Sequence, residues 1–280
     1  MNSLCIFLKY ARYRYILYRL FLRIKMGKKE RDDYLTKLRL SPIDFLPERP
    51  YVMDCGAKAM PRKGSRDFAM LFVTRELEIL SNLTMEENET FVDVGANAGA
   101  YTLMIANNYK DKGVRVISIE AHPENYKALC RNIHLNKFRN VKTINKAASD
   151  HDGIISLYER SHDGSRVDTE LYSISNTTVL DRTNVIHPEG RSLQLECDTL
   201  DHMLADQRAD VMKMDIEAAE VLALKGAANT LRKLRKLIVE IHGGNRPIIE
   251  QILREHGFHI QFIDKNMAHL MAFKDSVGKR

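Results

Sequence analysis

"FVDVGANAGAYTL", residues 91–103, is the stretch that decides the fold. An apolar run carries Asp93 and is followed by Gly95 and Gly99, with Asn97 between the two glycines. The residues after Gly99 have the pattern of a helix. A P-loop would place Gly-Lys-Ser/Thr after its glycines, and no lysine occurs here. A dinucleotide site would need G-x-G-x-x-G aimed at a pyrophosphate, but Asn97 occupies the place of the middle glycine.

A cationic ligand without phosphate fits this turn better, and S-adenosylmethionine combines an ammonium, a sulfonium, a carboxylate and an adenosine. The backbone from Gly95 to Gly99 lets a ligand approach closely because glycine has no Cβ. Asp93 would attract the cationic part directly or through water. Glu120 ends the next apolar run, where an acid accepts hydrogen bonds from ribose hydroxyls. The alternatives are a helix cap for Asp93 and a surface carboxylate for Glu120.

Strand-like and helix-like segments alternate from residue 88 onward, which predicts an α/β, doubly wound sheet with right-handed crossovers. The expected strands cover 90–95, 114–120, 141–145, 209–216, 236–242, 258–264 and 269–275, and the expected helices cover 67–83, 99–109, 122–136, 217–234 and 246–257. The connection between the last two strands is too short for a crossover helix, so this pair should be antiparallel. The result is a seven-stranded mixed sheet. Residues 150–198 interrupt it with two further strands, 153–159 and 191–200, and a polar insertion that could form a substrate lid.

The net charge of +6 is concentrated at the N-terminus, since residues 1–40 hold 11 lysines and arginines against 3 acidic residues. The main body therefore gives little reason to expect a nucleic acid partner. Residues 3–28 form an amphipathic, tyrosine-rich basic pattern, which either packs on the protein or makes peripheral contact with a membrane surface. We expect three parts: a helical extension (1–40), a connecting region with a lead-in helix (41–87) and the main domain (88–280).

Four scattered cysteines form no C-x-x-C pair and fit a reducing compartment. No apolar run reaches the length of a membrane span. We therefore predict a cytoplasmic protein, with attachment to the inner face of the membrane as an alternative.

Residues 88–273 resemble the FkbM family of S-adenosylmethionine-dependent methyltransferases. The resemblance is carried by "FVDVGANAGAYTL", "ISIEAHPENYKALCRNIHLN", "NKAASDHDG" and "DTLDHMLADQRADVMKMDIEAAEVLALKGA". It implies a class I, Rossmann-like methyltransferase fold and methyl transfer, most often to a hydroxyl of a carbohydrate or a polyketide-like product. The family's D-x-E-G-x-E occurs here as "DIEAAE", with Ala218 in place of glycine. If that position needs a positive φ, Ala218 will alter the pocket.

Carried over to this chain, the resemblance implies a cofactor site whose residues are Asp93, Gly95, Asn97, Gly99, Glu120, Asn125, Ala148 and Asp150. An ordinary helix residue at Asn125 and a simple turn at Asp150 are the alternatives. Asp215 or His242 would serve as the base, with Glu217 as an orienting residue or substrate ligand. We assign no metal ligands, although a divalent ion held by the His, Asp and Glu side chains is an alternative.

The sequence thus predicts an enzyme that methylates a hydroxyl of a carbohydrate, glycolipid or secondary metabolite. N- or C-methylation is one alternative, and a non-catalytic binding protein on the same fold is another. The expected partner is a small-molecule or glycan acceptor, and the sequence does not predict an oligomeric state.

Overall fold

The computed structural model describes residues 49–62, 65, 67–72, 77–161, 172–173, 185–186, 192–264 and 268–275. The predicted basic helix within residues 3–28 lies outside the described residues, as does most of the polar insertion. None of the helices in the described part combines the length and apolar character needed to span a bilayer.

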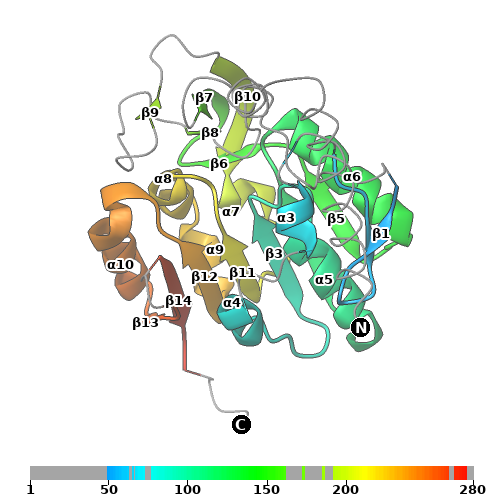
Figure 1. The fold of residues 1–280 in the computed structure, drawn as a ribbon. Helices are drawn as coiled ribbons and strands as arrows, with labels where there is room; N and C mark the ends of the chain where they lie inside the picture. The colour runs from blue at the N-terminus through cyan, green and yellow to red at the C-terminus, as the bar shows by residue number, and fades with distance from the viewer. Residues whose placement is uncertain are drawn as a thin grey trace, which may run out of the picture.

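A seven-stranded sheet forms the centre of the molecule, in the order β13-β14-β12-β11-β3-β4-β5 (Figure 1). Its strands are β3 (Thr90–Val94), β4 (Arg115–Ile119), β5 (Val141–Ile144), β11 (Val211–Met214), β12 (Lys236–Glu240), β13 (His259–Phe262) and β14 (His269–Phe273). β14 pairs antiparallel with both β12 and β13, and the other pairs are parallel. The predicted doubly wound mixed sheet, with its antiparallel last pair, is confirmed. Every residue of β3 and β11 is buried, as expected for strands covered on both faces.

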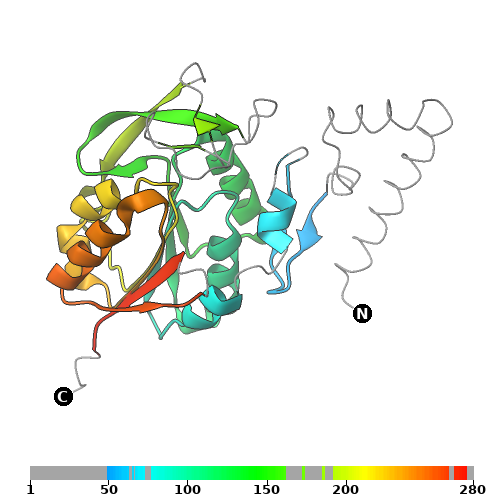
Figure 2. The ribbon, with the colours of Figure 1, turned by 60° about the vertical axis from the view of Figure 1, so that its left-hand side comes forward.

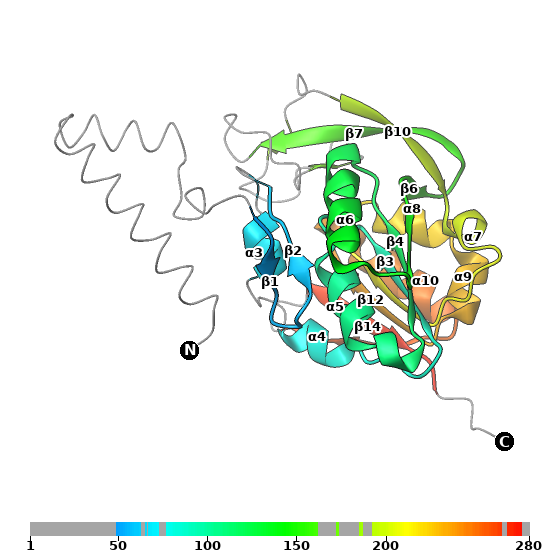
Figure 3. The ribbon, with the colours of Figure 1, turned by 90° about the vertical axis from the view of Figure 1, so that its right-hand side faces the viewer.

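Helices cover both faces of this sheet, as the edge-on view shows (Figure 3). One face carries α5 (Ala100–Asn108) and α6 (Pro123–Asn136), and the other carries α8 (Glu220–Lys225), α9 (Ala228–Lys233) and α10 (Arg246–Glu255). The largest buried apolar cluster joins α8, α9 and α10 to the sheet, and a second cluster fills the space under α5. α7 (Leu200–Met203) precedes β11.

The single helix expected over 217–234 is wrong, because α8 ends before Gly226 and α9 begins after it. A Cβ at Gly226 would lie 2.1 Å from the carbonyl oxygen of Ser149, so the chain crosses the neighbouring strand here too closely for any larger residue. The Asp201 carboxylate accepts hydrogen bonds from the backbone N–H groups of Asn229 and Thr230, at 2.8 and 2.6 Å, and thereby caps the start of α9.

A second, smaller sheet lies at one end of the main sheet (Figure 2). It contains β6 (Ala147–Ser149), β7 (Gly153–Ser161), β8 (Tyr172–Ser173), β9 (Val185–Ile186) and β10 (Ser192–Thr199). The strands expected at 153–159 and 191–200 are β7 and β10, and they pair antiparallel. β6 was not predicted, because three small residues carry too little pattern to indicate a strand.

The connecting region packs against the main domain. It forms a hairpin of β1 (Tyr51–Val52) and β2 (Lys58–Ala59), followed by α3 (Asp67–Phe72) and α4 (Leu77–Asn82). The rings of Tyr51, Phe68 and Phe72 pack together, and β2 exchanges hydrogen bonds with the Asn136 side chain at the end of α6. This packing brings residues of the connecting region to the edge of the cavity described next.

Candidate active site

A cavity of about 460 Å³ opens at the carboxyl ends of the central parallel strands. β3 lies between β4 and β11, where the strand order reverses, and this is the place where doubly wound sheets bind ligands. Leu157 of β7 borders the cavity from the second sheet. Of the residues that the sequence predicted, the lining includes Gly95, Asn97, Glu120, Asn125, Ala148, Asp215 and Glu217.

The turn after β3 passes very close to the end of β11. Gly95 has φ +81°, and a Cβ there would lie 1.8 Å from the carbonyl oxygen of Asp215. The N–H groups of Gly95 and Ala96 both donate to the carbonyl oxygen of Ile119, at 2.9 and 3.1 Å. The turn therefore connects three strand ends, and only glycine fits at its first position. Gly99 lies outside the lining, and its missing Cβ makes room for Leu129 of α6 instead.

Asp93, predicted as a cofactor contact, lies behind the turn and does not line the cavity. Its Oδ2 accepts hydrogen bonds from the N–H and hydroxyl of Thr102, at 3.0 and 2.7 Å. Asp93 thus has the role given above as the alternative to a cofactor contact, that of a carboxylate at the start of a helix, because Thr102 lies in the first turn of α5. Burial raises the pKa of Asp93, and the nearby Lys213 charge opposes the rise.

Glu120 lines the cavity and also holds the glycine turn. Its Oε2 accepts a hydrogen bond from the Asn97 N–H and its Oε1 one from the His122 N–H, both at 2.8 Å. Burial raises the pKa of Glu120 to about 7, against the lowering effect of these two hydrogen bonds. Asn97 adopts φ +49°, and its buried side-chain oxygen has no hydrogen-bond partner among the described residues. Asn125 is buried beside Glu120 and lines the same part of the cavity.

Two cofactor contacts were predicted at Ala148, which lies in β6, and at Asp150, which follows it. Ala148 lines the cavity, but Asp150 does not, and its carboxylate contacts His151 Nδ1 at 2.7 Å. Lys146, which the sequence did not single out, lines the cavity and forms an ion pair with Asp198 at 3.0 Å.

Lys213 is a site residue that sequence reasoning missed. It lies inside β11, is almost fully buried, and lines the cavity. Its Nζ is 3.0 Å from Asp215 Oδ2 and 4.7 Å from the centre of the Tyr101 ring. Burial raises the pKa of Asp215, but the charges of Lys213 and His242 outweigh burial and leave it below its ordinary value. A lysine within the apolar run "VMKM" was the signal that could have indicated it.

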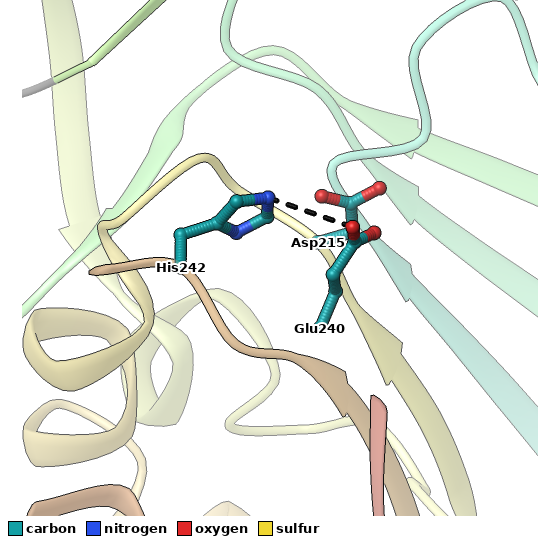
Figure 4. A group of neighbouring side chains, drawn as sticks. All are labelled: Asp215, Glu240 and His242. Atoms are coloured by element: carbon teal, nitrogen blue, oxygen red, sulfur yellow. Dashed lines mark ion pairs between the residues drawn. The ribbon is translucent and has the colours of Figure 1, made fainter. Parts of the chain in front are cut away.

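His242 does not line the cavity but lies beside carboxylates that do, as Figure 4 shows for Asp215 and Glu240. Its Nδ1 is 3.0 Å from Glu220 Oε1, and its Nε2 is 3.6 Å from Glu240 Oε1 and 3.7 Å from Glu217 Oε2. Burial lowers the pKa of His242, but the carboxylates of Glu220, Glu217 and Asp215 raise it to about 10. A pKa this high keeps the imidazole protonated at neutral pH, which favours Asp215 over His242 as the base of the two that the sequence offered. Glu240, which the sequence analysis did not single out, lines the cavity as well.

Ala218 and the residue before it have an unusual backbone. Glu217 has φ +50° and Ala218 has φ +77°, a region that L-residues seldom occupy. The glycine of the family's D-x-E-G-x-E motif is replaced here by Ala218, and the structure shows that this position does have a positive φ. The Ala218 N–H donates to Glu220 Oε1 at 3.0 Å, so the strained turn is tied to the carboxylate that contacts His242.

Residues 93–266, more than half of the chain, match the family model described as the methyltransferase FkbM domain. The chain belongs to the FkbM methyltransferase family. This FkbM protein is accordingly an S-adenosylmethionine-dependent methyltransferase with the class I fold.

Individual relatives of this chain have low sequence identity to it. Methyltransferase sdnD of Sordaria araneosa is 28% identical over 213 residues, which cover 63% of this chain and 76% of that protein. Among solved structures, the FkbM methyltransferase from Methylobacillus flagellatus KT is 19% identical with a TM-score of 0.48, and the match covers 75% of this chain and 48% of that chain. This chain thus spans about half the length of that solved protein. Fibrillarin from Aeropyrum pernix, solved with natively bound S-adenosyl-L-methionine, is 12% identical with a TM-score of 0.42 over 70% of this chain and 71% of that chain.

Proposed function

We propose that this methyltransferase transfers a methyl group to a hydroxyl oxygen of a small molecule with an apolar body, a secondary metabolite rather than a free sugar. The observation that carries the proposal is the mixed lining of the cavity. Carboxylates at the ends of β11 and β12 contribute to it. An apolar part of the lining comes from the connecting region and α5: Met53, Met70, Leu71, Phe72, Leu80 and Met104. Such a lining favours an acceptor that buries hydrocarbon beside its reactive hydroxyl.

The other part of the cavity suits the cofactor. Glu120 has both oxygens held at the end of β4 and retains lone pairs for ribose hydroxyls. The buried Asn97 oxygen lacks a partner, as expected where a ligand supplies the missing donor. The turn at Gly95 gives close access to the backbone, and Ala148 offers a small surface for the adenine. Asp93 would act indirectly, by fixing α5 through Thr102, and Gly99 by allowing α6 to pack. When bound, the cofactor supplies a methyl group on a sulfonium, so no further activation of the donor is needed.

The residues at the mouth of the cavity would position the acceptor and receive its proton. Glu217 lines the cavity and is the carboxylate that we assign as proton acceptor. Asp215 is held in place by Lys213 at 3.0 Å and would orient the hydroxyl. His242 lies 3.7 Å from Glu217, where it would position that carboxylate. A positioned base typically contributes 10²–10⁴-fold to such a transfer. The walls formed by Tyr101 and Met104 would exclude water while the oxygen is aligned with the methyl group.

The experiment is a turnover assay on a panel of acceptors, with formation of S-adenosylhomocysteine as the readout. We expect methylation of hydroxylated polyketide- or terpenoid-like alcohols and little turnover of free sugars or amines. Glu217→Gln should reduce turnover about 100-fold or more while leaving cofactor affinity nearly unchanged, because the lost group acts in the transition state. Glu124→Gln, an exposed carboxylate on α6, is the matched control and should behave as wild type. Turnover confined to amines or free sugars, or normal turnover by Glu217→Gln, would contradict the proposal.

Peripheral membrane contact through residues 3–28 remains a separate prediction, since these residues lie outside the described part. The full chain should co-sediment with anionic liposomes at low salt, and a chain starting at Pro42 should not. Binding should weaken as salt shortens the Debye length from about 10 Å at 0.1 M to about 3 Å at 1 M. If both chains stay in the supernatant at low salt, the prediction is wrong.

A further inference from the structure

Three side chains beside the cavity converge on one point. Asp215 follows β11, Glu240 ends β12, and His242 comes two residues later, so the two neighbouring parallel strands bring them together. One possible ligand atom from each residue lies within 4.8 Å of the other two. His242 Nε2 and Glu240 Oε1 are 3.6 Å apart, and Figure 4 shows both carboxylates facing the imidazole. Ligand atoms about 2.0–2.2 Å from one metal ion are separated by about 3–4.4 Å, so small side-chain movements would complete the geometry.

The orientation of His242 is the one that metal-binding histidines adopt. Its Nδ1 is paired with Glu220 Oε1 at 3.0 Å, and this directs Nε2 toward Glu240. Histidines that ligate metals commonly donate their other ring N–H to a carboxylate in this way. Glu220 is fully buried and also accepts a hydrogen bond from the Ala218 N–H. Its second oxygen is buried without a hydrogen-bond partner in the described part of the chain. The His242 imidazole is the group that faces the charge of this buried carboxylate, so Glu220 fixes the ring in place.

The charges around this point do not balance. Asp215, Glu217, Glu220 and Glu240 are four carboxylates, with side chains at most 31% exposed. Against them stand Lys213, His242 and His269, and His269 Nε2, 3.3 Å from Glu240 Oε2, is shared with a fifth carboxylate, since its Nδ1 lies 3.1 Å from Asp264. A surplus of negative charge in a partly buried site is costly unless a cation neutralises it. Lys213 contacts Oδ2 of Asp215, and Asp215 has a second oxygen with which to ligate an ion.

We propose that Asp215, Glu240 and His242 bind a divalent cation of borderline hardness, such as Mn²⁺, which displaces the Nε2 proton of His242 to solvent, with Glu220 as the residue that positions His242. Two carboxylate oxygens and one imidazole nitrogen suit this class of ion, and three protein ligands leave open positions on it. Asp215 and Glu240 line the cavity, so these positions face the space for the acceptor. The cation would therefore hold the acceptor oxygen, and this last step alone rests on the proposed function.

The test is a titration of the full chain with Mn²⁺ alone. The concentration of free Mn²⁺ is measured from its electron paramagnetic resonance signal. We expect one Mn²⁺ bound per chain below about 100 μM free ion. Glu240→Gln and His242→Gln should each weaken binding by at least about tenfold. Glu220→Gln should weaken it by about 10- to 100-fold, as for other residues that orient a ligand. The matched control is Glu124→Gln, an exposed carboxylate on α6, which should bind Mn²⁺ as wild type does.

Calorimetric titration with S-adenosylhomocysteine is the control that each variant keeps an intact cavity. The same titration separates a failure of the metal site from a failure of the proposed function. The metal site is refuted if the wild-type chain binds no Mn²⁺ at 1:1 stoichiometry while it still binds S-adenosylhomocysteine. It is also refuted if variants that bind S-adenosylhomocysteine normally retain wild-type affinity for Mn²⁺.

Discussion

Replacing Ala218 by glycine should stabilise the protein. Ala218 has φ +77°, and the left-handed conformation costs an L-residue about 1–2 kcal/mol. Glycine removes this strain but loses about 0.5–1 kcal/mol more backbone entropy on folding than alanine does. The hydrogen bond from residue 218 to Glu220 is made by the backbone N–H, so it survives the substitution. The net expectation is a gain of about 0.5–1 kcal/mol, or a rise in Tm of about 1–4 °C.

The assay is urea unfolding followed by circular dichroism, with Ala219→Gly as the matched control. Ala219 is the next residue, is buried, and has φ −88° and ψ −1°, where alanine carries no strain. Its substitution should destabilise the protein by about 1–2 kcal/mol through backbone entropy and one lost buried methyl group. The two glycine variants should therefore change stability in opposite directions. If Ala218→Gly destabilises the protein as much as Ala219→Gly does, the strain argument is wrong.

Two further predictions concern the cofactor end of the cavity. Gly95→Ala should abolish S-adenosylhomocysteine binding or folding, because its Cβ would lie 1.8 Å from the Asp215 carbonyl oxygen. Gly257→Ala, with a similar φ of +79° and open space around the Cβ, should cost only about 0.5–1 kcal/mol, by the same balance of strain and entropy as at Ala218. Equal effects in denaturant titrations would refute the close approach. The pKa of Glu120 is about 7, so its ionised fraction falls from about ten-elevenths at pH 8 to about one-eleventh at pH 6. Because the ionised carboxylate is the form that accepts hydrogen bonds from the ribose, affinity for S-adenosylhomocysteine should fall about tenfold over this range. Calorimetry should find no such fall in Glu120→Ala, and a wild-type affinity that does not change with pH would contradict this role.

The main sheet could be predicted from the sequence because parallel strands buried on both faces leave long apolar runs. "TFVDV" and "VRVISI" gave β3 and β4 nearly residue by residue. The division of 217–234 into two helices could not be predicted, because it depends on the approach of Gly226 to Ser149 across 77 positions of the chain. Helical periodicity reports local preference and contains no information on such a contact.

The candidate site was predictable where a residue's role follows from its position at a strand end. Glu120 and Asp215 line the cavity because carboxyl ends of neighbouring parallel strands share one edge. Asp93 belongs to the same motif, yet its side chain is directed to Thr102, and the direction of a side chain at the end of a strand is set by packing. The protonation of His242 depends on three carboxylates brought together by folding, so sequence alone could not distinguish a base from a cation.

The most direct test of the central claim is a calorimetric titration of S-adenosylhomocysteine into the wild-type chain, Glu120→Ala and Glu124→Ala. Both glutamates lie near the start of α6, but Glu120 lines the cavity and Glu124 is exposed and paired with Lys127. The account predicts that Glu120→Ala weakens binding by about 1–3 kcal/mol, or roughly 5- to 150-fold, because ribose hydroxyls lose a charged acceptor. Glu124→Ala should bind as wild type does. Equal affinity in all three proteins, with the fold intact by circular dichroism, would show that the cofactor does not bind at this cavity as described.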